Sequence, residues 1–122
     1  MIKGIGNDII EISRIQGVIT RQGQRFLDRV FTAKEQQYCL QHKEPARNFA
    51  GRFAAKEAIV KALGTGFKDG LSWLDFEILN DDKGKPVVYL STGALELFQN
   101  PVIMISISHC KEYATAVAII TI

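Results

Sequence analysis

Cysteine and long apolar runs are scarce in this sequence, and each scarcity excludes a class of protein. The 122 residues include two cysteines, Cys39 and Cys110, whose spacing fits neither a disulfide framework nor a metal site, so we expect reduced thiols and a cytoplasmic protein. No apolar run approaches the roughly 20 residues of a membrane-spanning helix, and the first residues do not resemble a signal peptide. A net charge of +2 is too small to indicate a nucleic-acid-binding protein. The length predicts a single domain, residues 1–122.

The stretch from Pro45 to Gly66 predicts one long helix around which the rest is organised. Pro45 suits a first helical turn, and Gly64 and Gly66 suit positions just past a helix C-terminus. At 100° per residue the bulky apolar side chains gather on one arc, namely Phe49, Phe53, Ile59, Val60 and Leu63. Small residues occupy the other side, namely Gly51, Ala54, Ala55, Ala58 and Ala62. A helix that is apolar on both sides is expected to be central and buried.

Glu57 and Lys61 lie one turn apart on this helix, at the border between its two faces, and the pair has two interpretations. The first is an exposed Glu-to-Lys contact at i,i+4, worth about 0.2–0.5 kcal/mol. The second is a carboxylate directed at a metal ion and an ammonium directed at a phosphate. Helix position alone does not choose between them.

Residues 2–12 alternate as a strand does, with Ile5 and Ile9 on one face and Gly4, Gly6 and Asp8 on the other. Two missing side chains beside a carboxylate would leave room for a bulky group to approach the backbone. The alternative is a bulged strand with an aspartate at its solvent end.

An arginine-rich segment follows this strand. Ser13 is placed to cap a helix whose Ile15, Val18 and Ile19 face inward. Four arginines punctuate the segment, namely Arg14, Arg21, Arg25 and Arg29. Such arginines usually form a solvated face, but beside exposed apolar neighbours they would suit an acidic partner helix. Residues 32–35 match a capping box, so a short helix is expected to follow.

The second half of the chain has the alternation of strands. Residues 74–79 and 86–90 predict a hairpin around a turn at 80–84, and a short helix is expected at 92–99. Two more strands are expected at 102–108 and 113–122. One strand, then helices, then antiparallel strands predict an α+β domain.

His109 follows the predicted strand at 102–108. A lone histidine there is most often a structural hydrogen-bonding group. Zinc is not expected, because no cysteine, histidine or acid lies at ligand spacing. A Ser108–His109 nucleophile pair is not expected either, because adjacent strand residues point to opposite faces. A phosphate contact is the remaining functional role.

Three blocks together resemble the holo-acyl-carrier-protein synthase type of 4′-phosphopantetheinyl transferase. They are GIGNDIIEI near the start, FAGRFAAKEAIVKALGTG in the middle and SISHCKEYATAVAII at the end. The resemblance covers essentially the whole chain and implies the fold of that family, an antiparallel sheet packed on a long central helix. Asn7 departs from the family pattern, in which an apolar residue or threonine usually precedes the aspartate.

The resemblance implies an enzyme that transfers the 4′-phosphopantetheine group of coenzyme A to a serine of an acyl carrier protein. Asp8 and Glu57 would hold Mg²⁺, which accepts one or two carboxylates together with substrate phosphates. Lys61 would contact the same phosphates and could protonate the leaving oxygen. Glu57 is also the candidate base for the carrier serine, directly or through a metal-bound water.

The family pattern implies binding roles for further residues. Arg52 and His109 would hold the 3′-phosphate of coenzyme A, Pro86 would line the adenine pocket, and Gly64 would let the pantetheine pass close to the backbone. The acidic helix of the carrier would dock on Arg14, Arg21 and Arg25, with Phe26 and Phe53 as apolar contacts. Short members of the family are homotrimers with sites between subunits. The two apolar faces of residues 114–120 make oligomerisation plausible.

Two other functions stay open on the sequence. A carrier-binding module without catalysis would keep the arginines but lose Asp8, Glu57 or Lys61, and this chain has all three. A different Mg²⁺-dependent enzyme that cleaves a nucleotide pyrophosphate would need no basic docking helix.

Overall fold

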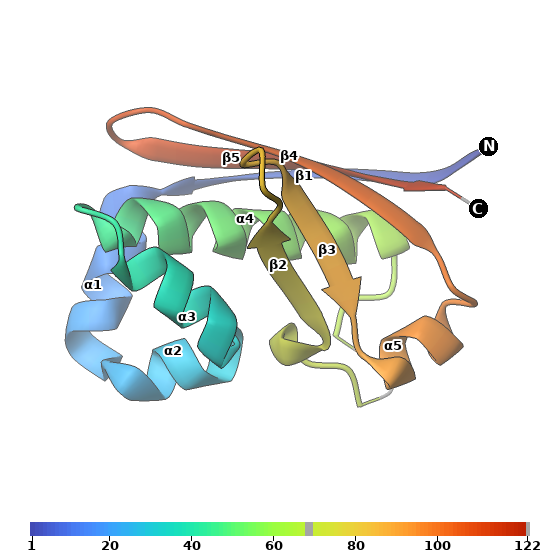
Figure 1. Cartoon of the computed structure of the whole chain (residues 1–122), viewed down its shortest axis with the longest axis horizontal. Helices are drawn as coiled ribbons and strands as arrows, with labels where there is room; N and C mark the ends of the chain where they lie inside the picture. The colour runs from blue at the N-terminus through green and yellow to red at the C-terminus, as the bar shows by residue number, and fades with distance from the viewer. Residues whose placement is uncertain (68–69, 122) are drawn as a thin grey trace.

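The computed structural model describes residues 1–67 and 70–121 and has the predicted α+β architecture (Figure 1). The first half of the chain contains β1 (Ile2–Glu11), α1 (Ile12–Gln22), α2 (Gln24–Val30), α3 (Ala33–Leu40) and α4 (Pro45–Leu63). The second half contains η1 (Trp73–Asp75), β2 (Phe76–Asn80), β3 (Pro86–Leu90), α5 (Thr92–Leu97), β4 (Val102–His109) and β5 (Tyr113–Thr121). Ile122, the last residue of the predicted closing strand, lies outside the described residues.

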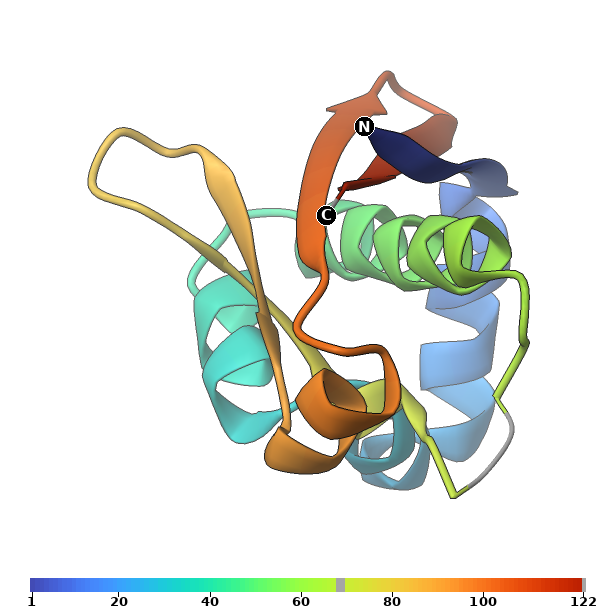
Figure 2. The same cartoon turned by 90° about the vertical axis from the view of Figure 1, so that its right-hand side faces the viewer.

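Helix α4 is the centre of the molecule and confirms the predicted long helix. Pro45 occupies its first turn, and Gly64 ends it with a φ of 76°, a left-handed conformation that suits glycine. In the view nearly along this helix, the three-stranded sheet covers one side, while the β2–β3 hairpin and α1 lie on either flank below it (Figure 2). The helix is therefore surrounded, as its two apolar faces predict.

The three-stranded sheet has the order β1-β5-β4, with β5 antiparallel to both neighbours. Three of the buried inward residues of β5 are alanines, namely Ala114, Ala116 and Ala118, and the fourth is Ile120. Ala116 and Ala118 pack in a cluster with Ala54 and Ala58 of α4, whereas Ala114 packs in the cluster that contains Ala50. Small residues on both sides let the sheet and the helix approach closely.

Gly4 and Gly6 allow a close approach to the backbone of β1, as predicted. A Cβ at Gly4 would lie 2.1 Å from the carbonyl oxygen of Ala62, and a Cβ at Gly6 would lie 2.2 Å from that of Ala58. The group that approaches these glycines is therefore the backbone of α4, and the space is not free for a ligand. Because Gly4 and Gly6 lack side chains, β1 lies close enough to α4 to bring Asp8 beside the helix.

One helix-capping prediction is confirmed and two local predictions are corrected. Thr32 and Glu35 form the predicted capping box at the start of α3. Ser13 does not cap α1, because the helix already begins at Ile12 and Ser13 lies within it. The predicted strand at 74–79 begins later, at Phe76, because a 3₁₀ turn with its own Ser72–Asp75 capping box occupies residues 73–75.

Cys39 is a buried free thiol and Cys110 an exposed one. None of the helices in the described residues is both long and apolar enough to cross a membrane.

Candidate functional site

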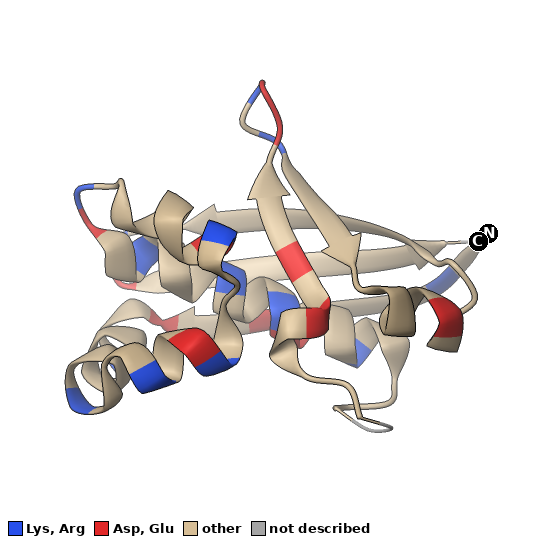
Figure 3. Ribbon diagram, turned by 60° about the horizontal axis from the view of Figure 1, so that its bottom comes forward, with Lys and Arg blue, Asp and Glu red and all other residues tan. Residues whose placement is uncertain are grey.

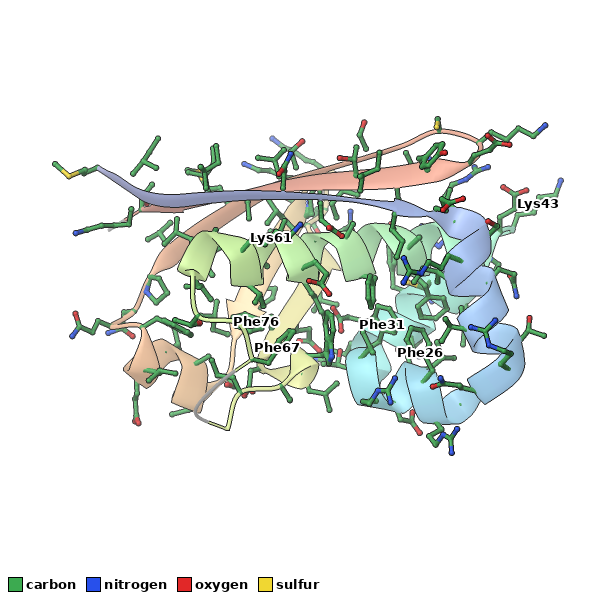
Figure 4. All side chains as sticks on the ribbon, turned by 180° about the vertical axis from the view of Figure 1, so that it is seen from behind. Phe26, Phe31, Lys43, Lys61, Phe67 and Phe76 are labelled. Atoms are coloured by element: carbon green, nitrogen blue, oxygen red, sulfur yellow. The ribbon has the colours of Figure 1, made fainter. Side chains whose placement is uncertain are left out.

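Asp8, Glu57 and Lys61 meet where β1 crosses α4. The ammonium Nζ of Lys61 donates to Asp8 Oδ1 at 3.0 Å and to the carbonyl oxygen of Asn7 at 3.1 Å. Figure 4 shows Lys61 on α4 beside β1. Within residues 1–67 and 70–121, the ion pair of Lys61 is thus with Asp8 and not with Glu57, so the interpretation as a simple i,i+4 contact is wrong.

These three residues line one cavity of about 350 Å³. Arg14 of α1 is the fourth charged residue of its lining, and the apolar part of the wall is formed by Ile9, Ile10, Ile15, Val18, Phe26 and Phe53. The cavity therefore joins two carboxylates and two cations to an aromatic wall contributed by α2 and α4. The Asn7 side chain is exposed, and nothing in the structure explains its departure from the family pattern.

The two carboxylates influence each other electrostatically. Partial burial raises the pKa of Glu57, the negative charge of Asp8 raises it further, and the ammonium of Lys61 lowers it in part. A cation held near both carboxylates would relieve this repulsion. Carboxylate oxygens from two separate elements are hard donors of the kind that Mg²⁺ prefers. Among the described residues no group of three or more potential ligands occurs, so phosphate and water oxygens would have to complete the coordination.

The predicted docking arginines lie on the exposed surface of α1 and α2, and Figure 3 shows the basic segments of these helices. The guanidinium of Arg21 extends over Gly17, where a Cβ would lie 3.1 Å from its Nη1. The one acid of this segment, Asp28, accepts hydrogen bonds from Gln24 at 2.8 Å and Gln36 at 3.1 Å, which lower the pKa of its carboxyl group. Asp28 is thus hydrogen-bonded to one side chain of α2 and one of α3.

Of the predicted coenzyme A contacts, Lys61 lines the cavity of Asp8 and Glu57, and the other four do not. Arg52 is buried, donates to Ile78 O at 3.1 Å and to Asn80 Oδ1 at 2.6 Å, and lies over the Tyr38 ring at 4.2 Å. Pro86 pairs with Asn80 in the hairpin, His109 ends β4 on the surface, and Gly64 follows α4. Among the described residues, these four are therefore not part of the lining that Asp8 and Glu57 share, although the backbone N–H of Gly64 donates to Lys61 O at 3.2 Å.

Sequence reasoning missed Lys56 and treated Glu35 only as a capping residue. Both side chains are completely buried and form an ion pair of 2.8 Å. The available signal was that, at 100° per residue, Lys56 lies between Phe49 and Leu63 in the middle of the bulky apolar arc of α4, a position that a solvated charge cannot occupy.

Known proteins similar to this chain belong to one family. The sequence model of the 4′-phosphopantetheinyl transferase superfamily matches residues 4–118. The holo-acyl-carrier-protein synthase of Protochlamydia amoebophila is 65% identical over 98% of both chains. The crystal structure of the synthase from Neisseria meningitidis has a TM-score of 0.91 at 33% identity and full coverage of both chains. That of the Helicobacter pylori synthase in complex with coenzyme A has a TM-score of 0.87 at 36% identity, covering 96% of this chain and 99% of that one.

Proposed function

The chain belongs to the 4′-phosphopantetheinyl transferase superfamily, and we infer that it is a holo-acyl-carrier-protein synthase. The serine oxygen of apo carrier protein forms a bond to the phosphorus that bears pantetheine. The bond from that phosphorus to the bridging pyrophosphate oxygen breaks, and adenosine 3′,5′-bisphosphate leaves. The observation that carries this inference is the cavity in which two carboxylates and Lys61 meet, on a chain related over its full length to such synthases.

Asp8 and Glu57 would hold Mg²⁺ at this cavity. Bound there, the ion would neutralise charge on the pyrophosphate and on the leaving bisphosphate. In the protein itself, Lys61 already compensates the charge of Asp8, and its side chain is 54% exposed. The ammonium is therefore accessible to a phosphate and could give a proton to the leaving oxygen.

Glu57 is the proposed base for the carrier serine. A carboxylate with an ordinary pKa is a weak base at neutral pH, whereas one whose pKa is raised takes up a proton more readily. In the metal-free protein, burial and the charge of Asp8 raise the pKa of Glu57, and the ammonium of Lys61 lowers it in part. Its place on the rigid central helix would hold it at one position relative to the docked serine.

The carrier protein would dock on α1 and α2. Arg14 lies in the cavity lining itself, so a helix bound over Arg14, Arg21 and Arg25 would end beside the carboxylates. Phe26 and Phe53 supply apolar wall at the same place.

We also propose a homotrimer with coenzyme A bound between subunits. The sheet face directed away from α4 exposes apolar side chains, among them Ile5 at 67%, Ile9 at 65% and Met104 at 50%. An exposed apolar surface of this kind indicates a protein contact. Arg52, Pro86 and His109, which lie apart from the carboxylates, would then reach the ligand from the neighbouring subunit, while Gly64 would border the pantetheine.

The test is the mass of apo acyl carrier protein after incubation with the enzyme, coenzyme A and Mg²⁺. The mass of the carrier should increase by one phosphopantetheine group. In a reaction that contains EDTA the carrier should stay unmodified, and addition of excess Mg²⁺ should restore the modification. Asp8→Asn should reduce turnover by orders of magnitude while circular dichroism stays unchanged. An unmodified carrier in the complete mixture would refute the function, and full activity in metal-stripped enzyme would refute the metal site. We place the reaction in the cytoplasm, which the free thiols Cys39 and Cys110 support.

A further inference from the structure

The buried ion pair of Lys56 and Glu35 joins the central helix to four other elements. Lys56 Nζ donates to Val30 O at 2.7 Å, to Glu35 Oε1 at 2.8 Å and to Trp73 O at 3.1 Å. Glu35 accepts in addition from Thr32 N and Ile78 N, each at 2.8 Å. These partners come from four places in the chain: the end of α2, the start of α3 with its cap Thr32, η1 and β2.

Stability alone does not account for this pair. Burial lowers the pKa of Lys56, because removing an ammonium from water is costly, and the negative charge of Glu35 raises it only in part. Replacing a satisfied buried ion pair by apolar side chains of similar size is often neutral or stabilising. An apolar side chain, however, could not bind the Val30 and Trp73 carbonyl oxygens, and so could not fix where these two segments lie.

Both of these segments support the proposed carrier site. Val30 ends α2, the helix that carries Phe26 into the cavity lining. Trp73 stacks on Phe53, the other aromatic residue of that lining, with ring centroids 4.9 Å apart and planes at 24°. Figure 4 shows Phe26 and Phe31 between α2 and α4 on this side of the molecule. One ammonium group thus holds both parts of the aromatic wall, and it belongs to the residue next to Glu57.

We propose that Lys56, anchored by Glu35, is a positioning residue for the transfer reaction, an inference that rests on the proposed function. It holds the carrier-docking helix α2 and the Trp73–Phe53 stack against the central helix. A docked carrier serine is thereby presented to Glu57 at a fixed distance. Lys56 itself is completely buried and touches neither substrate.

The test uses the double variant Lys56→Met/Glu35→Gln, which removes both charges together and leaves neither one unpaired. At a temperature where the variant is folded by circular dichroism, kcat for carrier loading should fall about 10–100-fold, since a displacement near 1 Å costs about that much. The dissociation constant for coenzyme A should stay at the wild-type value. Trp73 is the only tryptophan of the chain, so its emission and anisotropy should change and report the released stack.

Lys34→Met is the matched control, because Lys34 is an exposed lysine beside Glu35 and its loss should change none of these values. If the double variant does not fold, Glu35→Gln alone is judged by the same measurements, with a smaller fall in kcat expected. Wild-type kcat and an unchanged Trp73 signal in a folded variant would overturn the positioning role. A wild-type enzyme that fails to load the carrier would instead overturn the proposed function, which keeps the two failures distinct.

Discussion

Gly6→Ala tests how closely the metal site depends on the contact between β1 and α4. The new Cβ would lie 2.2 Å from Ala58 O and 2.7 Å from Ala62 N, whereas real Cβ contacts stay beyond 3.0 Å. Both opposing atoms are backbone atoms of α4 and cannot rotate away. The strand must therefore retreat from the helix by about 0.8 Å at this point.

Two consequences follow from that retreat. Overpacking of this kind costs about 1–3 kcal/mol of unfolding free energy, and Tm should fall by about 3–6 °C for each kcal/mol in a domain of this size. Asp8 lies two residues further on the same face, so it moves with the strand away from Glu57 and Lys61. Because a misplacement of about 1 Å can cost about 100-fold in rate, we expect kcat to fall about 10–100-fold.

The assay is carrier loading followed by mass spectrometry at a temperature well below the variant's Tm, repeated over a range of Mg²⁺ concentrations. Half-maximal activity should require more Mg²⁺ than in the wild type. Gly93→Ala is the matched control, because a Cβ there meets nothing within 4 Å; it should leave transfer unchanged and be neutral or stabilise α5 by about 0.5–1 kcal/mol. A Gly6→Ala enzyme with wild-type Tm and turnover would show that the glycine is not required for this approach.

Three further predictions concern charge and assembly. A raised folded-state pKa means that protonated Glu57 stabilises the fold below pH 4.5 and that this contribution is lost as the pH rises through the folded-state pKa. In EDTA, Glu57→Gln should therefore raise Tm more at pH 7 than at pH 4, and equal shifts at both pH values would contradict this. In Mg²⁺ the same variant should not transfer phosphopantetheine. Arg14→Ala should raise the carrier KM, and wild-type loading should slow with ionic strength; an equal loss of coenzyme A affinity would place the arginine elsewhere. Asp8→Ala and His109→Ala subunits, unfolded together and refolded in equal amounts, should recover about a quarter of wild-type activity, because about a quarter of interfaces in a random ring pair two intact faces; activity equal to the average of the parents would rule out a shared site.

Much of the fold could be predicted because its signals are local. The capping box at Thr32, the proline and glycine that bound α4, and the strand alternation around Ile5 each depend on neighbouring residues. The predicted start of α1 and the predicted start of β2 were wrong, because each local pattern was also compatible with a different boundary. Ser13 is a good capping residue, yet β1 passes into α1 at Glu11 without any side-chain cap. The turn at 73–75 precedes a strand whose pattern extends back over it.

The sequence by itself determined the central helix, the α+β class and, through its resemblance to a known family, the group of Asp8, Glu57 and Lys61. Only the tertiary structure decided which charges meet. Lys61 pairs across 53 positions with Asp8, and Lys56 pairs across 21 positions with Glu35 inside the protein. The periodicity of the sequence does not predict such pairs, because the distance between the two side chains depends on how strands and helices pack. The glycines of β1 make the same point: their missing side chains are visible in the sequence, but the helix backbone that fills the space is not.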